Sequence, residues 1–144
     1  MTSEDRKDIE SFLSNVQDFA ESQIINEPNA LTERLAQTGV YIAYMGHLTA
    51  TCKKIVSEAK AEVLDKYGEK LFKVQATMVK DLMNGKCKDA IFLLDWATNL
   101  EDSLKAQSDE IRTLISYAKH EAELFSQGYN QNVQIDNNQN FERS

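Results

Sequence analysis

The sequence predicts an all-α protein, in which two long helices, a short helical connector and an N-terminal helix form a bundle or coiled-coil-like domain. The chain of 144 residues is 42% hydrophobic and has a single proline, which is typical of one helical domain with a modest core. Apolar residues recur at spacings of three and four along three segments, as they do on one face of a helix. Breaks rich in Asn, Pro and Gly separate these segments. We expect residues 1–126 to form the domain.

The first helix is expected over residues 4–25. Ser3 is its predicted N-cap, because a serine hydroxyl can accept a hydrogen bond from a free N–H of the first turn, where two acids also lie. The sequence Asn-Glu-Pro-Asn at residues 26–29 should end this helix, since proline cannot continue the hydrogen-bond ladder. Asn29 is expected to cap the helix that follows.

The second helix is expected from Ala30 to Tyr67, with Gly68 as its stop. Its apolar positions alternate by four and three, which is the pattern of a coiled-coil seam. The small members of that seam indicate that a neighbouring helix approaches closely. Gly39 and Gly46 each cost about 1 kcal/mol relative to alanine inside a helix, and close packing or a kink would explain them. The seam comprises Leu35, Thr38, Ile42, Met45, Thr49, Cys52, Val56, Ala59 and Val63.

A connector with one or two short helical turns is expected over residues 68–85, with Asn84-Gly85 as a break. The last long helix should then run from Lys88 to Phe125. Gln107 and Glu121 interrupt its apolar seam, and two explanations are open. Polar residues there can set register or partner number, or the helix turns outward at those points. The seam comprises Leu93, Ala97, Leu100, Leu104, Gln107, Ile111, Leu114, Ala118, Glu121 and Phe125.

The apolar surface of both long helices is broader than one partner helix requires. This excess indicates a bundle, a subunit interface, or both. We therefore expect a homo-oligomer. The residues expected at its interface are Leu48, Ile55, Phe92, Trp96, Leu100 and Ile111.

Residues 127–144 contain nine Asn or Gln and no helical period, so we expect a flexible tail. Its strongly apolar residues are Val133, Ile135 and Phe141. They either dock on a partner as a short extended motif, or the tail extends into solvent.

Positive charge is concentrated in the middle of an acidic chain. The segment from Cys52 to Lys88 has nine lysines and five acids, whereas the whole chain has a net charge of −7 and a pI near 4.8. An aromatic residue among lysines can bind single-stranded nucleic acid through phosphate attraction and base stacking. Lysines interleaved with acids are equally typical of an ordinary solvated helix surface. The candidate nucleic-acid-binding residues are Lys53, Lys54, Lys60, Lys66, Tyr67, Lys70 and Lys73.

No residue pattern indicates catalysis or a cofactor. His47, Cys52 and His120 lack the spacing of a zinc site, and the dispersed glycines form no phosphate-binding loop. No nucleophile has a neighbouring base, so we expect neither an enzyme nor a metal site. The two cysteines are too few for a disulfide framework, which fits a reducing cytosol. We also expect no export signal and no membrane span, because no long apolar run occurs.

Residues 59–67, Ala-Lys-Ala-Glu-Val-Leu-Asp-Lys-Tyr, and residues 90–96, Ala-Ile-Phe-Leu-Leu-Asp-Trp, lie on either side of the connector. With Leu104-Lys105 and Ile111-Arg112 behind them, they resemble the UvsY-like recombination mediators of T-even phages over roughly residues 38–120. This resemblance implies a helical, oligomeric protein of the bacterial host cytoplasm. It also implies that the protein binds single-stranded DNA and assists a recombinase against a single-strand-binding protein. Lys60, Lys66 and Tyr67 would then lie in the strand-binding segment, and the helix through Trp96 and Ile111 would contribute to assembly.

Two hypotheses follow. The first is a phage or prophage recombination accessory that binds single-stranded DNA as an oligomer. The second is a helical interaction or inhibitor protein of a phage, whose acidic surface binds a basic protein partner without nucleic-acid contact.

Overall fold

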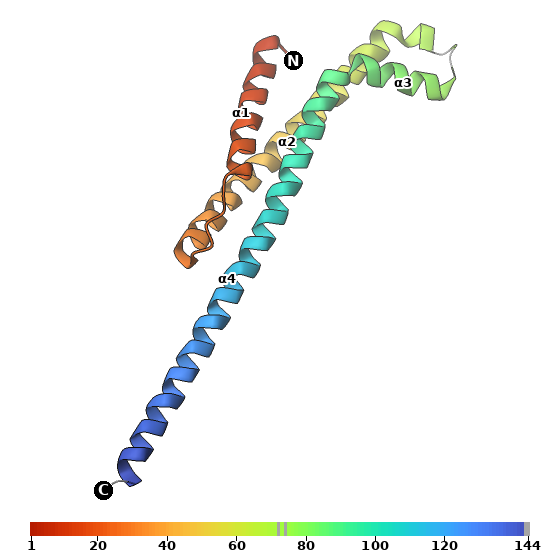
Figure 1. Cartoon of the computed structure of the whole chain (residues 1–144). Helices are drawn as coiled ribbons and strands as arrows, with labels where there is room; N and C mark the ends of the chain where they lie inside the picture. The colour runs from red at the N-terminus through yellow and green to blue at the C-terminus, as the bar shows by residue number, and fades with distance from the viewer. Residues whose placement is uncertain (72, 74, 143–144) are drawn as a thin grey trace.

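The computed structural model confirms the all-α fold (Figure 1). The structure describes the backbone of residues 1–71, 73 and 75–142, and the side chains of residues 1–70, 73 and 75–128. The expected connector residues Phe72 and Val74 lie outside the described residues. The four helices of the described part are α1 (Ser3–Glu21), α2 (Pro28–Leu71), α3 (Ala76–Lys86) and α4 (Lys88–Glu142).

Helix α1 begins one residue earlier than predicted, because Thr2 is its N-cap. The Thr2 hydroxyl accepts from the Asp5 N–H and the Asp5 carboxylate accepts from the Thr2 N–H, both at 3.1 Å. The two hydrogen bonds between Thr2 and Asp5 form a capping box. Ser3 could not form one, because the residue three positions later is Arg6, whose side chain has no hydrogen-bond acceptor. The predicted Ser3 cap was therefore wrong. The helix ends at Glu21 rather than residue 25, because Ser22 is extended and donates its N–H to Phe19 O.

Helix α2 begins at Pro28 and passes through Gly68, so both predicted boundaries differ from the structure. Proline suits the first helical position, because its missing N–H has no partner there. Glu27 O accepts from Leu31 N at 2.8 Å, which leaves Asn29 inside the first turn instead of capping it. No described glycine has a positive φ. Gly68 therefore does not adopt the left-handed conformation by which a glycine usually ends a helix.

The core lies between α2 and α4, which run antiparallel with α1 packed against them (Figure 1). The predicted seam of α2 is confirmed at its centre, where five positions are buried: Thr38, Met45, Thr49, Cys52 and Val56. The seam of α4 is confirmed at five positions: Leu93, Ala97, Leu100, Leu104 and Ile111. Leu13 and Val16 of α1 are fully buried in the same cluster. Burial of these apolar side chains is the main stabilising term of the fold.

The two glycines inside α2 are not explained by packing within the chain. A Cβ atom on Gly39 or Gly46 would meet no described atom within 4 Å apart from its chain neighbours and the backbone of its own helix. Both positions lie on the exposed side of α2.

Helix α3 contains the Asn84-Gly85 pair that was predicted to be a break. The break lies instead at Cys87, a single residue between α3 and α4 with φ −103° and ψ 14°. Hydrogen bonds continue across it, because Cys87 N donates to Met83 O at 2.9 Å and Ile91 N donates to Cys87 O at 3.0 Å. A glycine lowers helix stability without forcing an end, which is why this break was predicted in the wrong place.

Helix α4 continues to Glu142, whereas the sequence predicted its end near Phe125. No proline occurs in residues 126–142, and glutamine is an acceptable helix former, so nothing there interrupts the backbone ladder. This stretch extends alone past the start of α2 (Figure 1). Tyr117, Leu124 and Phe125 are accordingly 66%, 54% and 79% exposed. The side chains of Val133, Ile135 and Phe141 lie outside the described residues.

Gln107 interrupts the seam because it caps the C-terminus of α1. Its Nε2 donates to Ala20 O at 2.6 Å, and Arg34 Nη2 donates to Phe19 O at 2.6 Å. The Arg34 guanidinium also lies 4.0 Å from the centre of the Phe19 ring. Burial lowers the pKa of Arg34. The last carbonyls of a helix carry partial negative charge, so these donors suit that end. The explanation that the helix turns outward does not apply to Gln107, because this side chain is half-buried and bonded to α1.

Replacing Gln107 by alanine should therefore lower the free energy of unfolding. The loss should be about 1 to 2 kcal/mol, because a partly buried carbonyl loses its donor. Urea unfolding followed by circular dichroism measures it. The matched control is Gln127→Ala, at an exposed position of the same helix. Equal losses for the two variants would contradict the capping role.

Candidate nucleic-acid interface

The C-terminal end of α2 and the whole of α3 form a helical hairpin that projects beyond α1 (Figure 1). Between Lys66 and Lys86 the hairpin has five lysines and two acids, a net charge of +3 in a chain of −7. Helix α3 has no buried residue. Most of its side chains are therefore accessible to a ligand.

The structure divides the seven predicted nucleic-acid-binding residues into two groups. Lys53, Lys54 and Lys60 lie on the part of α2 that leads toward the hairpin. The other four lie in the hairpin itself: Lys66, Tyr67, Lys70 and Lys73. A ligand at the hairpin would therefore contact the second group first.

The first group does not form one patch. Successive residues of a helix point about 100° apart, so Lys53 and Lys54 diverge. Lys54 is 78% exposed, and its Nζ lies 3.8 Å from Glu58 Oε1. This is the one ion pair that a predicted binding residue makes within the described residues. Lys53 helps to lower the pKa of Glu101 on α4. Lys60 is half-buried. Part of the positive charge of this group is thus offset by nearby acids.

The second group centres on Tyr67. The Lys66 ammonium lies 5.6 Å from the centre of the Tyr67 ring, and the Lys86 ammonium lies 5.2 Å from it. The face of an aromatic ring attracts cations, which explains why two lysines gather here. Tyr67 itself is half-buried, whereas Lys66, Lys70 and Lys73 are exposed. The arrangement holds two positive charges beside one aromatic side chain.

Lys86 belongs to this cluster, although it is not among the seven predicted binding residues. It lies 19 residues after Tyr67 and comes near the ring only because α3 folds back along α2. The signal that could have placed it is the apolar spacing of Val79 and Met83, which are half-buried. That spacing predicts a helix returning along α2.

Glu101 is a carboxylate of the packed region whose pKa is changed by its surroundings. The pKa of its carboxyl is lowered, first by the nearby Thr49 hydroxyl and then by Lys105, whose Nζ lies 3.1 Å from Oε1. The Thr49 hydroxyl is buried and approaches this carboxylate without the geometry of a regular hydrogen bond. The Glu101 side chain is 17% exposed, so solvent screens these interactions only in part.

A carboxyl whose pKa is lowered by folding stabilises the native state above its unfolded pKa. That contribution disappears as the pH falls through the folded pKa, from about pH 5 to about pH 3. We therefore expect Glu101→Gln to lose less stability than the wild type over this interval. Urea midpoints at both pH values measure the difference. Glu110→Gln, at an exposed site on the same helix, is the matched control, and identical acid sensitivity of all three proteins would contradict the assignment.

The predicted oligomer-interface residues are distributed between the core and the surface. Leu100 and Ile111 are buried within one chain, whereas Leu48, Ile55 and Trp96 are half-buried. Trp96 Nε1 donates to Gln17 Oε1 at 2.9 Å, which joins α4 to α1. Phe92 is 55% exposed and its ring centre lies 5.9 Å from that of Trp96. Phe92 therefore has the largest free surface among the six.

Both thiols are buried, and burial raises the pKa of Cys52. Since the thiolate is the reactive form, neither position resembles a nucleophile. Among the described side chains, those of residues 1–70, 73 and 75–128, no group of three or more His, Cys, Asp and Glu could hold a metal ion. None of the described helices combines the length and the apolar character needed to cross a membrane.

Comparisons of the chain with protein-family models, with curated proteins and with solved structures gave no match. The resemblance to UvsY-like mediators stays a prediction from residues 38–120.

Proposed function

We propose that this chain is a non-enzymatic accessory protein of phage or prophage recombination that binds single-stranded DNA through its helical hairpin. Its role would be to assist a recombinase in loading against a single-strand-binding protein. The observation that supports this best is the pair of lysine ammonium groups beside Tyr67, at the exposed end of the most basic segment.

The physical basis is the combination of charge and an aromatic side chain. Lysines attract phosphates, and each neutralised phosphate releases counterions. An exposed ammonium–ring contact contributes only about 0.5 to 1 kcal/mol, so a phosphate or a base can replace it at low cost. Stacking of one base contributes roughly 1 to 3 kcal/mol. Single-stranded DNA has unpaired bases, so both phosphate attraction and base stacking can contribute to its binding.

One chain supplies few such contacts and is acidic elsewhere. Several copies would repeat the hairpin along one strand, and the second and later contacts would then be intramolecular. The proposed function therefore includes a homo-oligomer.

A salt titration tests the proposal. We expect binding of a fluorescein-labelled oligothymidylate, followed by anisotropy, to weaken steeply as the salt concentration rises, because counterion release dominates. A blunt duplex of the same length should bind more weakly, because its bases cannot stack on the protein. Absence of binding at low salt would overturn the proposal.

A second candidate function is protein binding without nucleic acid. It is favoured by the exposed apolar residues Tyr117, Leu124 and Phe125, which lie where α4 extends past the start of α2 (Figure 1). Exposed apolar surface of this kind marks interaction sites. This candidate predicts no salt-dependent binding to oligothymidylate.

A further inference from the structure

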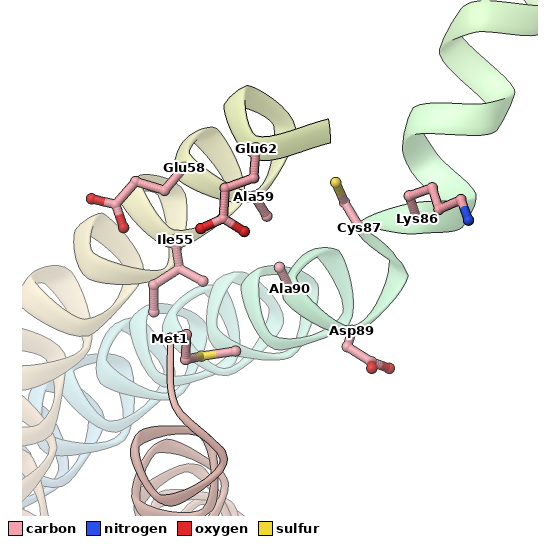
Figure 2. Close-up of a pocket in the computed structure, with 9 residues that line it drawn as sticks. All are labelled: Met1, Ile55, Glu58, Ala59, Glu62, Lys86, Cys87, Asp89 and Ala90. Atoms are coloured by element: carbon pink, nitrogen blue, oxygen red, sulfur yellow. The ribbon is translucent and has the colours of Figure 1, made fainter. Parts of the chain in front are cut away.

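A groove with an apolar floor and acidic walls lies where α1, α2 and the start of α4 meet. Two adjoining cavities of about 190 Å³ and 500 Å³ share Met1, Ile55 and Glu58. Figure 2 shows Ile55 and Ala59 on α2, Ala90 on α4, and Met1 beside Ile55. These apolar side chains are only partly covered within the chain, apart from Ala90.

The walls of the groove are negatively charged. Five carboxylates line it, against Lys54, Lys86 and the charged amino group of Met1. Three of the carboxylates have partners: Glu58 lies 3.8 Å from Lys54, Asp89 lies 3.0 Å from Arg6, and Asp5 accepts from the Thr2 N–H. The groove thus keeps an excess of negative charge. Its carboxylates are Asp5, Asp8, Glu58, Glu62 and Asp89.

The hairpin has the complementary properties. It carries a net charge of +3 between Lys66 and Lys86, or +2 without Lys86, which already lines the groove of its own chain. Met78 and Leu82, one helical turn apart on α3, are 56% and 48% exposed. Neither residue lines the groove of its own chain. The molecule therefore has a basic projection with exposed apolar side chains and a groove with an excess of carboxylates, and Lys86 lies where the two meet.

We propose that the hairpin of one copy docks into the groove of a second copy, with Met78 and Leu82 on the apolar floor and lysines facing the carboxylates. The two surfaces in this contact are different, so it is heterologous and leaves one free hairpin and one free groove at the ends of every dimer. Repetition gives a ring or a filament. The contact requires no nucleic acid, and its apolar part does not involve the Lys66–Tyr67 pair.

Two variants separate the two surfaces. The hairpin variant is Met78→Glu with Leu82→Glu, and the groove variant is Glu58→Lys with Glu62→Lys. All four side chains are exposed, so the thermal unfolding midpoints should equal that of the wild type. If the hairpin variant unfolds at a lower temperature, Met78→Ala with Leu82→Ala replaces it, and weaker association is then the expected result.

Light scattering coupled to size exclusion, without nucleic acid, is the measurement. We expect concentration-dependent association of the wild type and a monomer for each variant alone. An equimolar mixture of the two variants should give a one-to-one heterodimer and nothing larger, because one intact hairpin then meets one intact groove.

A wild type that stays monomeric at every concentration would overturn the proposal. So would association of either variant at the wild-type level, or a mixture that remains monomeric. The control variant Tyr117→Glu with Leu124→Glu changes the exposed stretch of α4 and should associate as the wild type does. Loss of association in that control would place the interface on α4 instead.

Discussion

Replacing Leu104 by alanine is expected to destabilise the protein by about 2 to 5 kcal/mol, the range for a large side chain removed from a packed core. Leu104 is 0% exposed and belongs to the cluster in which α1, α2 and α4 meet. Its removal loses the transfer free energy of three carbons and leaves a cavity that long helices cannot easily close. Urea unfolding followed by circular dichroism measures the loss.

The matched control is Leu124→Ala, the same substitution on the same helix at a side chain that is 54% exposed. Its cost should be within about 0.5 kcal/mol of zero, because a surface position lacks a packed environment. Comparable losses for the two variants would mean that Leu124 is covered in solution. That result would contradict the 54% exposure of Leu124.

The second large effect concerns the hairpin. Changing both Lys66 and Lys86 to glutamate should lower the affinity for oligothymidylate by on the order of 100-fold at low salt, because two attractive phosphate contacts become repulsive. The salt dependence should also become shallower, by about one unit of logarithmic slope for each lost phosphate contact. Fluorescence anisotropy at several salt concentrations measures both quantities.

Lys7→Glu with Lys119→Glu is the control for this variant. It makes the same change in net charge at two exposed lysines outside the hairpin. We expect at most a small loss of affinity, caused by the more negative net charge. Equal losses for the two double variants would show that overall charge, and not the lysine pair beside Tyr67, determines binding.

The sequence predicted the fold class and the packed seams well, because both depend on the spacing of apolar residues. The seam positions Met45, Cys52, Leu93 and Leu104 are all buried. Helix boundaries were predicted less well, because they depend on the competition between helical and non-helical backbone conformations at each end. Gly68 was expected to end α2, and Gly85 to interrupt the connector, yet both are helical. Glycine makes a helix less stable, but surrounding residues decide whether it ends.

The candidate site was predicted only in part, for a topological reason. A run of lysines in sequence does not show which of them share a face, and Lys53 and Lys54 proved to point apart. The approach of Lys86 to Tyr67 depends on the return of α3, which the spacing of Val79 and Met83 indicated only weakly. Likewise, Gln107 interrupted the seam visibly, but its partner Ala20 O could be identified only from the packing of α1.

Hydrogen exchange with and without oligothymidylate tests the central proposal most directly, since it reports where the strand binds. The account predicts slower exchange at the end of α2 and in α3, around Tyr67 and Lys86, with no change in α1 or around Leu124. Slower exchange in α1 or in the last part of α4, with none in the hairpin, would contradict it.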